Sequence, residues 1–176
     1  MIEKIEGFNK HVAIVGFKDV KIKDANSLLS LVRERTEGVE VQFLDAGLIA
    51  GWKHLYFAAL NALKAFENRL NISNSLAVET LLYASAQRQI KKAVDLLGIK
   101  ANSSNVAVVV LAETEFKTKE TLETLTQLLP GRHDDSVLEL TERKFDGVRK
   151  LFDISETELN AELENKGMKK KALTDL

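Results

Sequence analysis

Hydrophobic and polar positions divide the chain into segments with two different periods. Between residues 44 and 98, apolar residues recur at three- and four-residue spacing, which predicts three consecutive helices. The first helix carries an apolar stripe that includes Trp52 and Tyr56, and the third repeats the spacing up to Leu97. Gly98 follows, and we expect it to end the third helix in a left-handed cap. The remaining elements are arranged around this stretch.

Other apolar runs predict strands before and after the three helices. Residues 11–17 and 106–112 are apolar almost throughout, which is typical of strands covered on both faces. Residues 39–43 alternate between apolar and polar side chains, as a half-buried strand does. Residues 138–140 are expected to add a short edge strand.

Helical spacing also recurs outside the central stretch. We expect helices at residues 25–37, at 122–129 before Pro130-Gly131, from about Thr141, and from a capping box at Ser155 and Glu158. We expect a last helix to open at residue 168 and to be truncated at Leu176. The pattern predicts one α/β or α+β domain spanning residues 1–176, with a small mixed sheet of three to four strands and about seven to eight helices.

Composition narrows the class of protein. The 176 residues include no cysteine and carry a net charge of −1. There is therefore no disulfide framework and no thiol nucleophile. No apolar run reaches the roughly 18 residues of a membrane span, and the first ten residues do not resemble a signal peptide. We expect a cytoplasmic protein that does not contact a membrane.

The distribution of charge is more informative than its sum. Residues 45–100 hold seven basic and four acidic side chains, whereas residues 101–176 hold 11 basic and 15 acidic ones. Within the basic part, polar residues gather at the joints between the predicted helices: Lys53, His54, Gln87, Arg88, Gln89, Lys91 and Lys92. A cationic helix start favours anions such as phosphate. A solvated basic surface without a ligand is the alternative.

The residues that catalysis usually needs are scarce. The chain has three histidines, and His133-Asp134-Asp135 is the only cluster with metal-ligating groups. No second histidine lies at helix or hairpin spacing to it, so we interpret the cluster as a solvated turn. Glycine-rich phosphate loops and nucleophile elbows are also missing from the sequence. We expect no enzyme activity, no metal and no cofactor.

Three segments carry a resemblance to a known family. AGLIAGWKHLYFAALNALKAF, SLAVETLLYASAQRQIKKAVDLLGI and the strand VAVVVLA resemble the kinase-binding accessory subunits of the KEOPS complex, the PRPK-binding protein family. The most specific tract is ETLLYASAQRQIKKAVDLLGI, and the resemblance covers nearly the whole chain. In the family the final helix continues for several turns beyond the point that corresponds to Leu176.

The resemblance implies a non-catalytic subunit with two partners. One is the small atypical kinase or ATPase of the complex. The other is tRNA, held by its 3′ CCA end during threonylcarbamoyl-adenosine modification; no DNA partner is implied. The polar joint residues are then the candidates for tRNA binding, and the apolar residues Leu81, Leu82, Leu173 and Leu176 are candidates for kinase binding. Two alternatives stay open: an adaptor without RNA contact, and a small-molecule enzyme with a pocket around His54.

Overall fold

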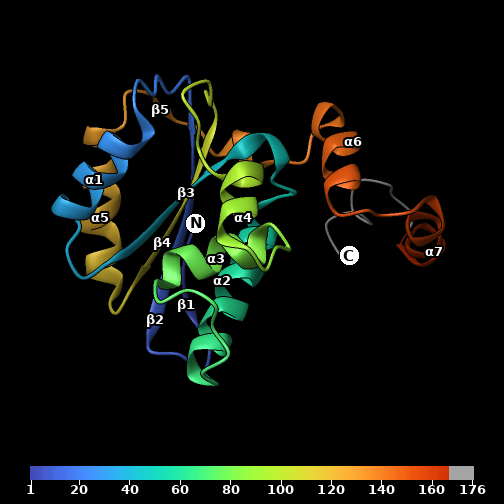
Figure 1. Ribbon diagram of the computed structural model, residues 1–176, viewed down its shortest axis with the longest axis horizontal. Coiled ribbons are helices and arrows are strands. Elements are labelled where there is room, and N and C mark those ends of the chain that lie inside the picture. Colours follow the sequence, from blue (N-terminus) through green and yellow to red (C-terminus); the bar gives the residue numbers. More distant parts are fainter. Residues whose placement is uncertain (167–176) are drawn as a thin grey trace.

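An antiparallel sheet forms the centre of the computed structural model, which describes residues 1–166 and the side chains up to residue 161 (Figure 1). Its strands are β1 (Ile2–Ile5), β2 (Lys10–Lys18), β3 (Glu40–Asp45), β4 (Val106–Ala112) and β5 (Arg132–His133). The order across the sheet is β1-β2-β4-β3, and β5 pairs with the end of β2. Every pairing among these strands is antiparallel.

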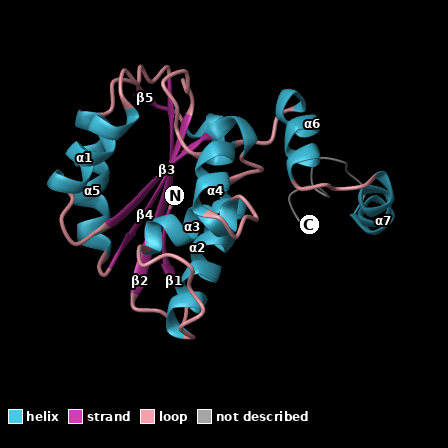
Figure 2. Cartoon of the chain, viewed as in Figure 1, coloured by secondary structure: helices cyan, strands magenta, loops and turns pink. Residues whose placement is uncertain are grey.

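Helices cover both faces of this sheet (Figure 2). The helices are α1 (Ala25–Arg35), α2 (Trp52–Glu67), α3 (Leu76–Ala84), α4 (Ile90–Leu97), α5 (Glu115–Leu128), α6 (Glu142–Leu151) and α7 (Glu156–Lys166). Short 3₁₀ turns, η1 (Ala46–Leu48) and η2 (Asp135–Leu138), follow β3 and β5. α1 and α5 lie on one face, and α2, α3 and α4 lie on the other. The expected α+β class is confirmed.

The two-sided cover explains the continuous apolar run of β4. All seven of its residues are buried. Val109 and Leu111 face the cluster formed with α2, α3 and α4, whereas Val108 and Val110 face the cluster formed with α1 and α5. Because successive side chains of a strand point to opposite faces, a strand with two covered faces contains no polar alternation.

The sheet differs from the expected one in three respects. It is antiparallel instead of mixed, and it includes β1 and the two-residue β5, which the apolar pattern did not predict. Residues 138–140 form no strand, because Asp134 caps η2 by accepting the Ser136 N–H and leads the chain into a turn. The end of α4 differs from the expected one as well. Gly98 does not form a left-handed cap; its backbone is extended, with φ −66° and ψ 149°, because it forms a bridge with Leu44.

α6 and α7 extend to one side of the three layers (Figure 1). A small apolar cluster with Ala50, Val148 and Leu159 at its centre attaches them to the body. The predicted capping box starts α7: the Ser155 N–H donates to Glu158 Oε2 at 2.7 Å, and the Glu158 N–H donates to Ser155 Oγ at 3.2 Å. The expected last helix, with Leu173 and Leu176, lies outside the described residues.

Candidate nucleic-acid interface

The link between α3 and α4 is a tight turn that contains the Gln-Arg-Gln segment. α3 ends at Ala84, and Ala86 reverses the chain with a positive φ of 52°. α4 begins only at Ile90, so Gln87 and Arg88 lie in the turn. We expected Gln87, Arg88 and Gln89 to open the third helix, with Arg88 on the same face as Lys91 and Lys92. That expectation is wrong, because Arg88 precedes the helix and shares no helical face with the lysines.

His54 connects the start of α2 to this turn. Its Nδ1 accepts the Ala50 N–H at 3.3 Å, and its Nε2 donates to the Ala84 carbonyl at 2.8 Å. The ring also packs edge-on against Phe152 after α6, with 5.4 Å between ring centroids. Burial lowers the pKa of His54 below its ordinary value, and the hydrogen bond to Ala84 opposes that shift only in part. The imidazole is thus neutral, and neither ring nitrogen is free to exchange a proton with a substrate.

A groove of about 270 Å³ opens beside the turn, between α3 and the loop that precedes it. Its lining combines apolar and polar side chains: Leu70, Ile72, Glu79, Leu82, Tyr83, Ala86, Gln87 and Arg88. Leu70, Ile72 and Tyr83 are exposed at its walls. Arg88 is exposed as well and adds a positive charge to the lining. The arrangement offers a flat group a place to stack and an anion a cationic partner.

The sequence-predicted RNA residues fall into three groups in the structure. Gln87 and Arg88 line the groove. Gln89, Lys91 and Lys92 are exposed at the start of α4, within four residues of Arg88. Lys53 is exposed at the start of α2, while His54 faces inward and joins the group only through Ala84.

Sequence reasoning missed the acidic floor of the groove. Glu79 is only 1% exposed, and its Oε2 accepts the N–H groups of Ile72 at 3.0 Å and Ser73 at 2.7 Å. A single carboxylate inside the apolar run LAVETLLYA was the available signal. It was not decisive, because a helix can also carry such a residue on a solvated face.

The two leucines expected to contact a kinase are core residues. Leu81 and Leu82 are each 2% exposed and pack in the cluster under α2 and α3, so they do not present a docking surface. Exposed apolar groups occur elsewhere. Trp52, which we expected in the core, is exposed together with Phe57. Tyr56 contacts both rings edge-on and connects them into one aromatic surface on α2.

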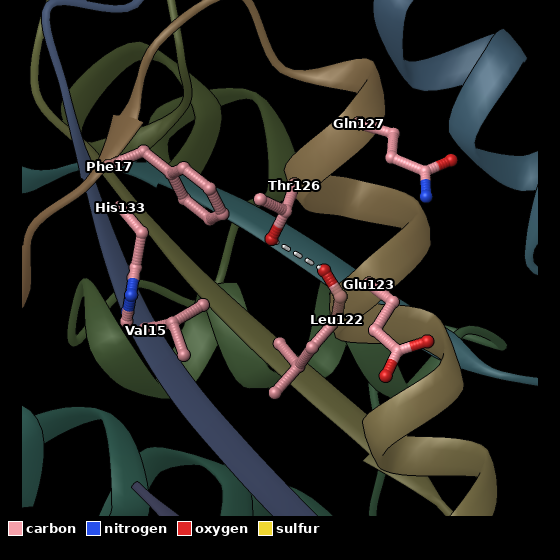
Figure 3. A pocket seen from close by; sticks show the side chains of 7 residues that line it. All are labelled: Val15, Phe17, Leu122, Glu123, Thr126, Gln127 and His133. Atoms are coloured by element: carbon pink, nitrogen blue, oxygen red, sulfur yellow. Dashed lines mark hydrogen bonds between the residues drawn. The ribbon is translucent and has the colours of Figure 1, made fainter.

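A second groove of about 420 Å³ lies between β2 and α5 (Figure 3). Val15, Phe17 and Leu122 form its apolar part, with Glu123 and Gln127 on α5 at its edge. His133 lies at the other side, where its Nε2 is 3.0 Å from Asp135 Oδ1. That oxygen also accepts the Gly16 N–H at 2.7 Å, so Asp135 fastens the start of η2 to β2.

Neither a cluster of potential metal ligands nor a membrane-spanning helix occurs in the part of the chain that the structure describes. Over residues 1–166, no three His, Cys, Asp or Glu side chains are grouped so that they could hold a metal ion. Likewise, no helix within that range has the length and apolarity to cross a bilayer.

The fold defines a small α+β protein, and it exposes one aromatic surface on α2 and one cationic surface at the start of α4. Comparison with known proteins identifies its family. The family model described as "Kinase binding protein CGI-121" matches residues 17–175. The chain is also 34% identical over 117 residues to "Regulatory protein Cgi121" of Methanocaldococcus jannaschii. These 117 residues cover 66% of this chain and 72% of that protein. The chain belongs to the CGI-121 family of kinase-binding proteins, which confirms the resemblance found in the sequence.

Proposed function

We propose that this protein is a non-catalytic subunit of a KEOPS complex, in which it binds the small kinase or ATPase and recruits tRNA by its 3′ CCA end. The family supports the kinase partner. The tRNA role rests on one observation, the groove in which Arg88 lies beside exposed apolar walls. Single-stranded nucleic acids are bound where cationic groups meet surfaces on which bases stack.

Each part of this groove has a role in the proposed complex. Arg88 contacts a phosphate, and Tyr83 stacks on a base. Lys91 and Lys92 extend the positive surface along the start of α4, where free backbone N–H groups add to it. His54 does not contact RNA in this arrangement; it holds the turn through Ala84.

Salt dependence of tRNA binding tests the RNA part of the proposal. Arg88→Ala should weaken binding of intact tRNA by about tenfold at low salt and reduce the slope of log affinity against log salt by about 0.7, the value for one single-strand phosphate contact. Arg33→Ala removes the same charge from α1, on the other face of the sheet, and should change neither. tRNA without its CCA end should bind wild type weakly. Equal affinity for intact and shortened tRNA would exclude recognition of the CCA end, and no measurable binding of either would support the adaptor without RNA contact.

For the kinase we propose the aromatic surface on α2. Trp, Tyr and Phe are the residues that protein interfaces favour at their centres. Phe57 is 54% exposed and is held by Tyr56, so its ring is ordered before a partner arrives. Leu173 and Leu176 remain candidates from the sequence alone.

A binding measurement with the purified kinase subunit tests this surface. Phe57→Ala should weaken binding by at least about tenfold, that is about 1.4 kcal/mol. Phe116→Ala is a matched control, because Phe116 is 75% exposed on α5, across the sheet from α2. Equal affinity of the Phe57 variant and wild type would exclude this surface and leave the C-terminal residues as the remaining candidates.

A further inference from the structure

The buried part of the groove beside α3 contains one hydrogen-bonding side chain, Glu79, next to the apolar Leu82. Glu79 lines the groove although it is almost fully buried, and both hydrogen bonds found for it among the described residues end on Oε2. A carboxylate can accept about four hydrogen bonds over its two oxygens. Oε1 therefore keeps the capacity to accept a donor from a group that enters the groove.

Gln87 adds a second acceptor at the edge. Its Nε2 donates to the Ser85 carbonyl at 3.3 Å, which leaves its Oε1 for other partners. The cationic donor of the groove, Arg88, is exposed at the rim rather than buried at the floor. A ligand that fills the groove thus meets a positive charge and an amide acceptor at the rim and a carboxylate acceptor inside.

The walls limit what such a ligand can be. Leu70, Ile72 and Tyr83 are exposed and apolar or aromatic, so they suit a flat ring. The volume of about 270 Å³ lies near the lower end of small-ligand sites, which favours one ring system over several.

We propose that this groove selects a nucleobase with an exocyclic amino group and disfavours uracil, with Glu79 as the selecting residue. The inference rests on the proposed function and adds base preference to it. Cytosine, adenine and guanine each present an amino group to an acceptor. Uracil has a single N–H flanked by two carbonyl oxygens, and placing those oxygens against a buried carboxylate leaves lone pairs facing each other.

The first test changes only the RNA, so folding of a variant is not an issue. Wild-type protein is titrated with a short tRNA acceptor stem ending in CCA and with the same stem ending in UUU. Each base of CCA is then replaced in turn by its analogue without the amino group, pyrimidin-2-one for cytosine and purine for adenine. We expect UUU to bind at least about tenfold more weakly and at least one analogue to lose about fivefold or more in affinity, because each loses a hydrogen bond to a base. Equal affinity for all these stems would overturn the proposal.

The second test assigns the preference to Glu79. Glu79→Gln keeps the shape but exchanges one acceptor oxygen for a donor, so the CCA-to-UUU affinity ratio should fall to about threefold or less. A purely structural role would weaken both stems equally and leave the ratio unchanged, which would overturn the assignment. Gln87→Met provides a second variant at the rim, outside the hydrogen bonds that Glu79 makes, and should also reduce the ratio.

The two proposals fail in different ways. If the stems bind with a dependence on Arg88 but without base preference, the selection by Glu79 is wrong and the RNA role stands. If neither stem binds wild type, the RNA role itself is wrong.

Discussion

His54 shows how a residue can matter at a binding site without touching the ligand. It was a candidate RNA contact because it stands beside Lys53 at a helix start. In the structure both its ring nitrogens bond to backbone groups, of Ala50 and Ala84, and its edge meets Phe152. A buried imidazole is favourable only in its neutral form, so the stability of the folded protein depends on pH.

We expect His54 to reduce stability in mildly acidic solution. Its pKa is lowered in the folded protein, while the unfolded chain has the ordinary value of about 6.5. As the pH falls below that value, the unfolded state takes up the proton more readily, so the free energy of unfolding decreases. Urea unfolding at pH 7.5 and 5.5 should show a smaller loss for His54→Gln than for wild type. Equal losses in the variant and wild type would refute the role of His54.

Single residues of the groove were predictable only where the sequence marks them. Gln87 and Arg88 stand out as a polar group between apolar helices. Glu79 does not, because its burial depends on the loop of residues 68–75 folding back so that two N–H groups reach its carboxylate. The extended backbone conformation of Gly98 likewise depends on its bridge to Leu44, which lies 54 positions earlier in the chain. Local pattern cannot reveal such distant partners.

At the scale of elements, α3 depends on a residue from another part of the chain. Glu40 on β3 accepts the Ser75 hydroxyl at 3.0 Å and the Ala77 N–H at 2.9 Å with the same carboxylate oxygen. A carboxylate at this end of a helix satisfies free N–H groups and interacts favourably with the helix dipole. β3 therefore fixes where α3 begins, and α3 in turn places Glu79 and Tyr83 at the groove.

Glu40→Ala should lower the free energy of unfolding by about 0.5–2 kcal/mol, the range for a lost helix cap. The free energy of unfolding of Glu40→Gln should lie between those of Glu40→Ala and wild type, because an amide oxygen accepts the same hydrogen bonds without the charge. Chemical denaturation measures the free energy of unfolding of each protein. Glu37→Ala is the control, because Glu37 is an exposed glutamate on the neighbouring turn. If Glu40→Ala and Glu37→Ala were equally stable, the cap would contribute nothing.

For the molecule as a whole, the apolar pattern predicted the covered strands and the helices but not the connections among them. β4 was evident because both its faces are buried. β1, with the sequence IEKI, has only one buried residue, Ile5, and pairs with β2 at an edge of the sheet. Such a strand has little apolar signal of its own, because its stability comes from the neighbour that it joins. The antiparallel order is likewise a property of the assembled sheet.

The way α6 and α7 attach suggests that the molecule opens in two steps. Their cluster is separate from the two cores beside the sheet, and Phe152 joins it to the body through His54. Phe152→Ala should therefore release α6 and α7 before the sheet unfolds. In hydrogen exchange we expect protection over residues 142–161 to drop by about tenfold, or about 1.4 kcal/mol of local opening, while β4 keeps its protection.

The same experiment tests whether the attachment reaches the groove. Because His54 contacts both Phe152 and Ala84, loss of the ring leaves one side of the imidazole open to water and loosens its hold on the turn at residues 84–89. The N–H groups of Ala86 and Gln87 donate to the carbonyls of Tyr83 and Leu82, so their exchange should rise together with that of α6. Phe116→Ala on α5 should alter neither region. Equal loss of protection in β4 would mean that the helices and sheet unfold as one unit, and the C-terminal helices would then not act as a separable part of the protein.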